Sequence, residues 1–388
     1  MTTYDWIVIG AGITGASLAY ELSKQFRVLL LEKDKIPDNA TVYSYGGLAY
    51  WSGTDELTRH LSKEGIELHR NLSEELAGDT EFRELDLVLT IDRHDDPEAI
   101  AKNYDRFAIT PELLDVQEAC KLEPLLNPNA IAGCLKLPHG HIHPQKTTDA
   151  YLKAMVRNGG KIIYQGAIAF VREGDKVIGV QTEADTYHSA NTVVCAGGLS
   201  RSLLQKAGIK IDNYFTHAQV ITAPPIDFDL STIVMPAILQ RFSLEATAGE
   251  LAADSSWDNL QLPVPTVLDT GAVQFIDGSL CLGQISAIRS NPATRLDNTV
   301  AEAEIRKAIS NTLPFLEKVS GTCHQCLVAF NDKAIALVGN LPNTEGLYLF
   351  SGFTSTLIYA PILARHFAVW ASGNKNKIIE QLQMAINN

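Results

Sequence analysis

Three glycines near the N-terminus have the spacing of a phosphate-binding turn. Gly10, Gly12 and Gly15 form a G-x-G-x-x-G pattern, and Glu32 follows seventeen residues after the last of them. In this pattern the first glycine permits a tight turn, the second lets the backbone approach a pyrophosphate, and the third lets a helix pack closely on a strand. A carboxylate at that distance accepts hydrogen bonds from ribose hydroxyls. These residues predict a dinucleotide site.

The residues around the glycines predict the elements that such a site needs. The runs 6–9 and 28–31 are short and apolar, as is typical of buried parallel strands. Between them, Leu18 and Leu22 are one turn apart on a predicted helix, whose N-terminus would favour the pyrophosphate. Because Glu32 would repel a 2′-phosphate, NADP is disfavoured, and the pattern leaves NAD and FAD open.

Composition and charge narrow the class of protein. The 388 residues are 46% hydrophobic and 20% charged, enough for two globular domains. A net charge of −13 argues against nucleic acid or an anionic membrane as a partner. Six irregularly spaced cysteines, with no targeting segment before the first strand, indicate a cytoplasmic protein with reduced thiols. The apolar stretch 355–372 contains Pro361, Arg365 and His366, which favours a buried helix over stable membrane insertion.

The remaining pattern predicts a second domain inserted into the first. Helical periodicity is found at 56–80, 97–107, 115–122, 147–158 and 299–312, whereas 213–289 is rich in strands and turns. We expect an α/β fold, α+β overall, with a Rossmann-type dinucleotide domain and an inserted substrate domain built on an antiparallel sheet. The predicted dinucleotide domain comprises 1–55, 140–212 and 325–388, and the predicted substrate domain comprises 56–139 and 213–324.

Motifs along nearly the whole chain resemble the D-amino-acid-oxidase superfamily of FAD enzymes, in particular its glycine oxidase and sarcosine oxidase branch. Besides the glycine turn, they are ATVYSYGGL at 40–48, GHIHP at 140–144, VVCAGGLSRSLL at 193–204 and VGNLPNTEGLYLFSGF at 338–353. The resemblance implies that the cofactor is FAD rather than NAD, and that the Rossmann-type domain binds it.

The resemblance also implies which residues hold FAD. Ile168 falls where a backbone contact to adenine is expected, and Gly352 begins a turn whose N–H groups approach the pyrimidine end of the flavin. Where relatives have several glycines after that position, this chain has Phe-Thr-Ser-Thr at 353–356. The predicted FAD contacts are Gly10, Gly12, Ile13, Thr14, Gly15, Glu32, Lys33, Ser44, Gly46, Gly47, Leu48, Ile168, Ala196, Gly197, Gly198, Gly339, Gly352, Phe353, Thr354, Ser355 and Thr356.

Two departures from the family pattern concern the substrate and oxygen. Glycine-oxidase-like members bind the substrate carboxylate with an arginine, and the corresponding residue here is Val328. Arg241 and Arg289 are the candidate replacements, and surface or structural arginines are the alternative. Sarcosine oxidases place a lysine over the flavin, and Cys281 in that place favours a dehydrogenase.

Further candidate residues are aromatic or carry sulfur or imidazole. Tyr50, Trp51 and Tyr359 are candidates to line the substrate cavity, or else belong to the core. Cys326 has the spacing of the cysteine that carries FAD covalently in sarcosine oxidases, so a thioether is one hypothesis, and non-covalent FAD with a buried thiol is the other. The pair Cys323 and Cys326 has no second such pair, as structural zinc requires, and no metal site is expected.

Three histidines alternate along the chain before a predicted helix. His139, His141 and His143 would share one face of a strand, a geometry that metals can use, but no carboxylate or cysteine is nearby. In the family this stretch is a structural turn into a helix, and we expect the same here. His217 begins a predicted strand near the cavity, and no role is assigned to it.

Together these observations predict an FAD-dependent oxidoreductase. It would transfer a hydride from the α-carbon of a small amine or amino acid to flavin N5, giving an imine, with O₂ or another compound as electron acceptor and with no side chain assigned as the catalytic base. The alternatives are a 2-hydroxy-acid dehydrogenase on the same fold and a flavin-binding protein without turnover. The substrate and the oligomeric state stay open.

Overall fold

Two β-sheets organise the chain in the computed structural model, which describes residues 3–240, 243–245, 247–249, 257 and 266–387. The strands of the first sheet are β1 (Thr3–Ile9), β2 (Val28–Leu31), β7 (Lys161–Ile163), β8 (Ala167–Glu173), β9 (Lys176–Thr182), β10 (Thr186–Val194), β16 (Leu337–Asn340) and β17 (Leu347–Ser351). Those of the second sheet are β3 (Gly47–Leu48), β4 (Arg83–Asp92), β5 (Glu112–Leu114), β6 (Ile131–His141), β11 (Tyr214–Ala223), β12 (Ile233–Pro236), β13 (Val267–Gln274), β14 (Leu280–Ile288) and β15 (Thr322–Phe330). The helices are α1 (Ile13–Ser23), α2 (Glu56–Glu75), α3 (Pro97–Lys102), α4 (Val116–Leu122), α5 (Pro144–Arg157), α6 (Ser200–Gln205), α8 (Asn298–Thr312), α9 (Thr356–Ala371) and α10 (Lys377–Asn387), with 3-10 turns η1 (Gly197–Leu199) and η3 (Pro314–Lys318).

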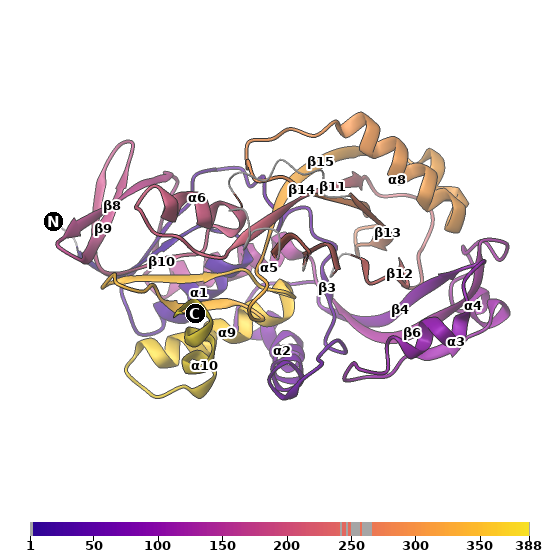
Figure 1. Cartoon of the computed structure of the whole chain (residues 1–388), viewed down its shortest axis with the longest axis horizontal. Helices are drawn as coiled ribbons and strands as arrows, with labels where there is room; N and C mark the ends of the chain where they lie inside the picture. Colours follow the sequence, from indigo (N-terminus) through magenta and orange to yellow (C-terminus); the bar gives the residue numbers. More distant parts are fainter. Residues whose placement is uncertain (1–2, 241–242, 246, 250–256, 258–265, 388) are drawn as a thin grey trace.

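The first sheet has the topology expected for a dinucleotide fold. Its strand order is β16-β17-β10-β1-β2-β7, and β1 runs parallel to both β10 and β2. All four residues of β2 are buried, as are the last four of β1, which explains their continuous apolar runs. In Figure 1 this sheet lies on the side of the labelled N-terminus, and the second sheet lies on the side of α3, α4 and α8.

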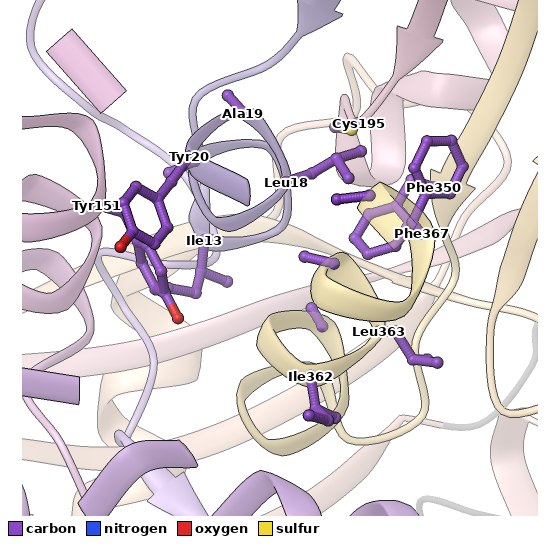
Figure 2. Packing of buried hydrophobic residues seen from close by; sticks show 14 of the residues in the cluster. Ile13, Leu18, Ala19, Tyr20, Tyr151, Cys195, Phe350, Ile362, Leu363 and Phe367 are labelled. Atoms are coloured by element: carbon purple, nitrogen blue, oxygen red, sulfur yellow. The ribbon is translucent and has the colours of Figure 1, made fainter. Parts of the chain in front are cut away.

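Helices α1 and α9 cover one face of the first sheet. Figure 2 shows Leu18 of α1 pointing toward Phe350 of β17 and Phe367 of α9, and all three side chains are fully buried. Burial of each such side chain stabilises the fold by about 1.5–3 kcal/mol. Among the described residues no helix has both the length and the apolar character needed to cross a membrane, and Arg365 of α9 forms ion pairs with Glu21 and Glu75.

The second sheet is mixed rather than purely antiparallel. Most neighbouring strands are antiparallel, as expected, but β4 and β12 run parallel, with Ile233 beside Leu87. A parallel pair needs a long connection, and a local residue pattern does not reveal which distant strand is the neighbour.

Two elements lie with a different sheet from the one that the predicted domain ranges suggest. Helix α2, within 56–139, packs against α9, and its buried Leu61 and Leu72 belong to the core of the first sheet. Strand β15, partly within 325–388, pairs with β11 along its whole length in the second sheet. Periodicity shows that an element has a buried face but not which sheet that face contacts. The domain ranges themselves stay a prediction.

Candidate functional site

Two of the three glycines in the turn between β1 and α1 leave no room for a side chain. Gly10 has φ +105°, and a Cβ there would lie 2.6 Å from the carbonyl oxygen of Cys195 at the end of β10. A Cβ on Gly15 would lie 1.9 Å from the carbonyl oxygen of Gly10. At Gly12 a Cβ would meet only Thr41 Oγ1, at 3.2 Å. The turn therefore exposes a glycine backbone to any anion at the N-terminus of α1.

Glu32 lies beside this turn, at the end of β2. Its carboxylate accepts hydrogen bonds from the N–H of Ala11 (2.7 Å) and the N–H of Asp34 (3.1 Å). The N–H of Ile13 donates to Thr41 Oγ1 at 3.1 Å, which ties the loop after β2 to the first turn of α1. The carboxylate is thus held next to the glycine turn, as a ribose-binding acid must be.

Two further predicted FAD contacts are Lys33, which follows β2, and Ile168, the predicted adenine contact, in β8. Lys33 forms an ion pair with Asp34, and a Cβ on Gly166 would approach the Lys33 side chain to 3.3 Å. The pairing of β8 with β9 shifts register between Ala167 and Ala169, so Ile168 lies outside the regular ladder. A bulge of this kind leaves backbone groups available to a ligand.

The loop at 40–48 reaches the edge of the second sheet. Gly46 has φ +76°, and a Cβ on it would lie 2.1 Å from the carbonyl oxygen of Ile142. Ser44 Oγ accepts a hydrogen bond from the N–H of Gly46, and a Cβ on Gly47 would lie 2.7 Å from His139 Nε2. Leu48 is fully buried in the core, and its side chain does not line the cavity described below.

The C-terminal turn is held by a buried asparagine that the sequence analysis missed. Asn331 Nδ2 donates to the carbonyl oxygens of Gly352 (2.6 Å) and Ala334 (3.0 Å). Its Oδ1 accepts from the N–H groups of Lys333 (2.9 Å) and Ala334 (2.8 Å). Gly352 has φ +69°, a conformation that favours glycine. An Asn followed by polar residues just before a strand is a turn signal, and it could have identified this residue.

Residues 196–198, the second glycine-containing segment predicted to contact FAD, lie at η1, whereas Gly339 lies beside α10. Gly197 has φ +54° with open space around its Cβ position, whereas a Cβ on Gly198 would lie 2.8 Å from Leu327 Cβ of β15. Ala196 is half-buried and precedes η1. Gly339 faces Gln383 of α10 and does not line the cavity.

A cavity of about 360 Å³ lies between the turns of the first sheet and the face of the second. From the N-terminus of α1, the loop at 40–52 and the C-terminal turn it is lined by Ile13, Ala40, Thr41, Tyr43, Ser44, Tyr45, Gly47, Ala49, Trp51, Ser52 and residues 353–358. From the second sheet and the segments around it, it is lined by Leu87, Leu89, Tyr104, Phe107, His139, Ala218, Val220, Ile233, Met235, Pro236, Ile238, Leu239, Asp269, Gln284, Cys326 and Val328. Among these described residues Asp269 is the only Asp, Glu, Lys or Arg.

Burial keeps the other titratable groups of the cavity uncharged near neutral pH. It lowers the pKa of His139 to about 3 and raises the pKa of the Cys326 thiol to about 12. It also raises the pKa of Tyr104 to about 12, with a smaller contribution from the charge of Asp269. Trp51 Nε1 donates a hydrogen bond to His139 Nδ1 at 3.0 Å, so the neutral imidazole acts as an acceptor.

The predicted substrate residues are not gathered in one place. Tyr50 lies 3.4 Å from Glu84 through its hydroxyl, and the buried Tyr359 hydroxyl lies 3.1 Å from Ser62 Oγ. Neither lines the cavity, and neither does Arg289, whose guanidinium donates a hydrogen bond to the carbonyl oxygen of Ile288. Arg241 lies outside the described residues. Trp51, by contrast, does line the cavity.

The residues singled out as departures from the family pattern are distributed as follows. Val328 and Cys326 line the cavity, so the position predicted to correspond to the carboxylate-binding arginine carries an apolar side chain there. Cys281 is buried and its thiol points to the carbonyl oxygen of Tyr43, 3.7 Å away. His217 is buried, with Nε2 3.2 Å from the carbonyl oxygen of Asn291, and does not line the cavity.

The alternating histidines have separate hydrogen-bond partners. His141 Nε2 lies 2.9 Å from the carbonyl oxygen of Tyr45, and His143 caps α5 by accepting from the N–H of Lys146. Within the described ranges no group of three His, Cys, Asp or Glu side chains is arranged to hold a metal ion.

Comparisons with known proteins place the chain in a family. The sequence profile described as "DAO: FAD dependent oxidoreductase" matches residues 5–370. The chain is 26% identical over 377 residues to 4-methylaminobutanoate oxidase (formaldehyde-forming) of Paenarthrobacter nicotinovorans; this match covers 94% of the chain but 43% of that relative. It is 25% identical over 397 residues to the uncharacterized oxidoreductase YurR of Bacillus subtilis, covering 96% of each protein.

A solved structure has the same fold. Glycine oxidase from Geobacillus kaustophilus superposes with a TM-score of 0.79 over 97% of this chain and 96% of that one, at 17% identity. This agreement confirms the predicted fold class, and the profile match confirms FAD as the cofactor and oxidoreductase as the class of enzyme. The chain belongs to the DAO family of FAD-dependent oxidoreductases.

Proposed function

We propose that this protein oxidises a small amine or amino acid at the carbon next to nitrogen. The observation that carries the proposal is the cavity, because the segments lining it include both predicted flavin-binding turns and the face of the second sheet. A substrate in this cavity would lie between the predicted flavin-binding turns and the cavity side chains. These side chains can differ between proteins that act on different substrates.

The residues present fit FAD. The glycine turn, which a Cβ on Gly10 or Gly15 would fill, suits the pyrophosphate, and Glu32 suits the ribose. We assign the adenine to the neighbourhood of Lys33 and Ile168, and the flavin to the turns at 41–47 and 352–356. When bound, FAD accepts a hydride from a substrate carbon, which yields an imine that water hydrolyses.

The protein contributes orientation and a dry, preorganised surface. Asn331 fixes the turn at Gly352, the N–H of Thr354 donates to the carbonyl oxygen of Ile335, and the N–H groups of 353, 355 and 356 would stabilise negative charge at one end of the cofactor. The apolar wall that includes Leu87 and Val328 excludes water from the reacting carbon.

We propose a cytoplasmic location, since all six cysteines are unpaired.

The test is an anaerobic titration of the purified yellow protein while the flavin absorbance is followed. The panel contains glycine, sarcosine, D-amino acids, cyclic secondary amines, N-methylalkylamines and 2-hydroxy acids. We expect bleaching by an amine, and admission of air then distinguishes O₂ from another electron acceptor. Bleaching by hydroxy acids alone would replace the proposal with a 2-hydroxy-acid dehydrogenase. Bleaching by dithionite but by no donor would indicate a flavoprotein without turnover.

A further inference from the structure

Helix α9 contains a proline that leaves one backbone carbonyl without its usual helical partner. Pro361 lies inside α9 and has no N–H to donate to the carbonyl oxygen of Leu357, four residues earlier. His69 of α2 supplies the missing donor, since its Nε2 lies 2.8 Å from that carbonyl oxygen. Because a carbonyl oxygen only accepts, Nε2 carries the proton of the imidazole. A side chain of one helix therefore completes the backbone hydrogen bonding of another.

The imidazole of His69 contributes this hydrogen bond and no charge near neutral pH. The side chain is fully buried, and burial lowers its pKa to about 4. Its other nitrogen, Nδ1, is buried and has no hydrogen-bond partner among the described residues. An unpaired buried nitrogen is destabilising, whereas an apolar side chain of similar size would pack without that penalty. The bond to the Leu357 carbonyl is thus the interaction that a histidine adds at this position.

Two further contacts from α2 reach the same part of α9. Ser62 Oγ lies 3.1 Å from the hydroxyl of Tyr359, and a Cβ on Gly65 would lie 2.6 Å from the carbonyl oxygen of Ile358. Ser62, Gly65 and His69 are three and four residues apart, so they share one face of α2. The two helices are neighbours in Figure 1. One face of α2 therefore contacts three consecutive residues at the start of α9.

This part of α9 borders the cavity between the two sheets. Residues 353–358 line the cavity, and no residue of α2 is among the described residues that line it. The N-cap of α9, Ser355, makes no capping hydrogen bond through its side chain, so it leaves the first N–H groups of the helix uncapped. Helix α2 thus holds a turn with available N–H groups without itself reaching the cavity.

We propose that His69 is a positioning residue that, by bonding the carbonyl left free by Pro361, holds the first turn of α9 where its N–H groups stabilise the reduced flavin. This inference rests on the placement of the flavin at 352–356 in the proposed function. Reduction adds negative charge to the flavin, and N–H groups held in fixed positions stabilise the more negative form to a greater extent. His69 would thereby favour flavin reduction without contacting the flavin.

The test is an anaerobic equilibrium between the holoprotein and a reference dye of known potential, with no amine present. His69→Leu should lower the equilibrium constant for flavin reduction by about tenfold, because the turn loses the bond that fixes it. His69→Gln keeps an N–H donor and should stay within about threefold of the natural protein. A residue that only supported the fold would change the affinity for oxidised and reduced FAD alike and leave this equilibrium unchanged.

Pro361→Ala provides an independent arm, because it returns a backbone N–H that can bond to the Leu357 carbonyl. In that background His69→Leu should change the reduction equilibrium by less than about threefold. If His69→Leu on its own does not retain FAD, the double variant should retain it for the same reason. An equal loss in both backgrounds, or loss of FAD from the double variant while Pro361→Ala retains it, would overturn the inference.

The matched control is His60→Leu on the same helix. His60 is exposed, and its imidazole lies 3.5 Å from Glu64. The substitution should leave the reduction equilibrium unchanged, and thermal unfolding and FAD content verify that each variant is intact. Equal shifts in His60→Leu and His69→Leu, or a shift in His69→Gln as large as that in His69→Leu, would also refute the role of His69.

The dye equilibrium separates this inference from the proposed function, because it involves no amine. If His69→Leu shifts the equilibrium as expected and no amine bleaches the flavin, the proposed function fails and the role of His69 stands. If amines bleach the flavin but His69→Leu leaves the equilibrium unchanged, the proposed function stands and this inference fails.

Discussion

The turn between β1 and α1 and the cavity between the two sheets are built from different parts of the chain. In the turn, backbone atoms lie so close that a Cβ on Gly15 would overlap the carbonyl oxygen of Gly10 at 1.9 Å. The cavity is closed instead by side chains from many separate segments, including Trp51, Tyr104, Asp269 and Val328. The turn excludes a side chain at Gly10 and Gly15, whereas the wall of the cavity consists of side chains.

This difference separates what binds the cofactor from what selects the substrate. In the proposed FAD site, backbone N–H groups and the Glu32 carboxylate would recognise parts of FAD that do not change from one relative to another. Cavity side chains such as Val328 can be exchanged without moving the backbone, so the same fold accepts different donors. Substitutions in the turn should therefore abolish the holoprotein, and substitutions in the cavity should change its substrates.

The largest effect is expected at Gly15. Gly15→Ala should prevent formation of a stable yellow protein, because its Cβ cannot be accommodated even without cofactor. Gly12→Ala is the matched variant: its Cβ meets only the Thr41 hydroxyl at 3.2 Å, so the apoprotein should stay folded while FAD affinity falls at least tenfold. Thermal unfolding of the apoprotein and FAD titration measure the two effects separately. Stoichiometric FAD in Gly15→Ala would refute the placement of the cofactor.

A smaller but still large effect is expected where one side chain holds a backbone turn. Asn331→Ala removes four hydrogen bonds around Gly352 and should lower the free energy of unfolding by about 2–4 kcal/mol. FAD affinity should fall with it, since that turn is part of the proposed flavin site.

Urea denaturation of the apoprotein and FAD titration measure the Asn331 variant, and Asn374→Ala is its control. Asn374 is exposed and bonds only locally to Ser372, so the change should be below about 0.5 kcal/mol. Equal effects of the two substitutions would show that the turn does not depend on Asn331.

The same contrast explains how much could be predicted from the sequence. The glycine turn, its two strands and Glu32 lie within one short segment, and local spacing encodes their geometry. The parallel pairing of β4 with β12 and the packing of Phe107 against Trp51 depend on contacts between residues far apart in the chain. No local periodicity reports such contacts, so Tyr104 and Asp269 could not be identified as cavity residues.

Buried histidines should make stability depend on pH in one direction. Burial lowers the pKa of His69 to about 4 and the pKa values of His139 and His141 to about 3, from an ordinary 6.5. Below pH 6.5 the unfolded chain binds protons that the folded chain does not, so stability falls as the pH drops toward these values and is constant above about pH 7. At pH 5 each histidine should cost about 2 kcal/mol.

Urea denaturation at pH 7.5 and pH 5.0 measures this loss. His139 lines the cavity and His141 is on the same strand, whereas His69 belongs to α2 and does not line the cavity. His69→Gln should reduce the pH dependence by about 2 kcal/mol over this range. An unchanged pH dependence in that variant would show that His69 is protonated in the folded protein.

The smallest effect is expected at Cys326, and it concerns whether FAD is covalently bound. Cys326 lines the cavity, but burial raises the pKa of its thiol to about 12, and thioether formation proceeds from a thiolate. We therefore expect acid precipitation to release all the flavin into the supernatant, with Cys326→Ala giving the same result. Flavin that stays in the precipitate of the natural protein but not of the variant would establish the thioether. In that case the cavity side chains would bind the cofactor as well as the substrate, and the separation between the two regions would be lost.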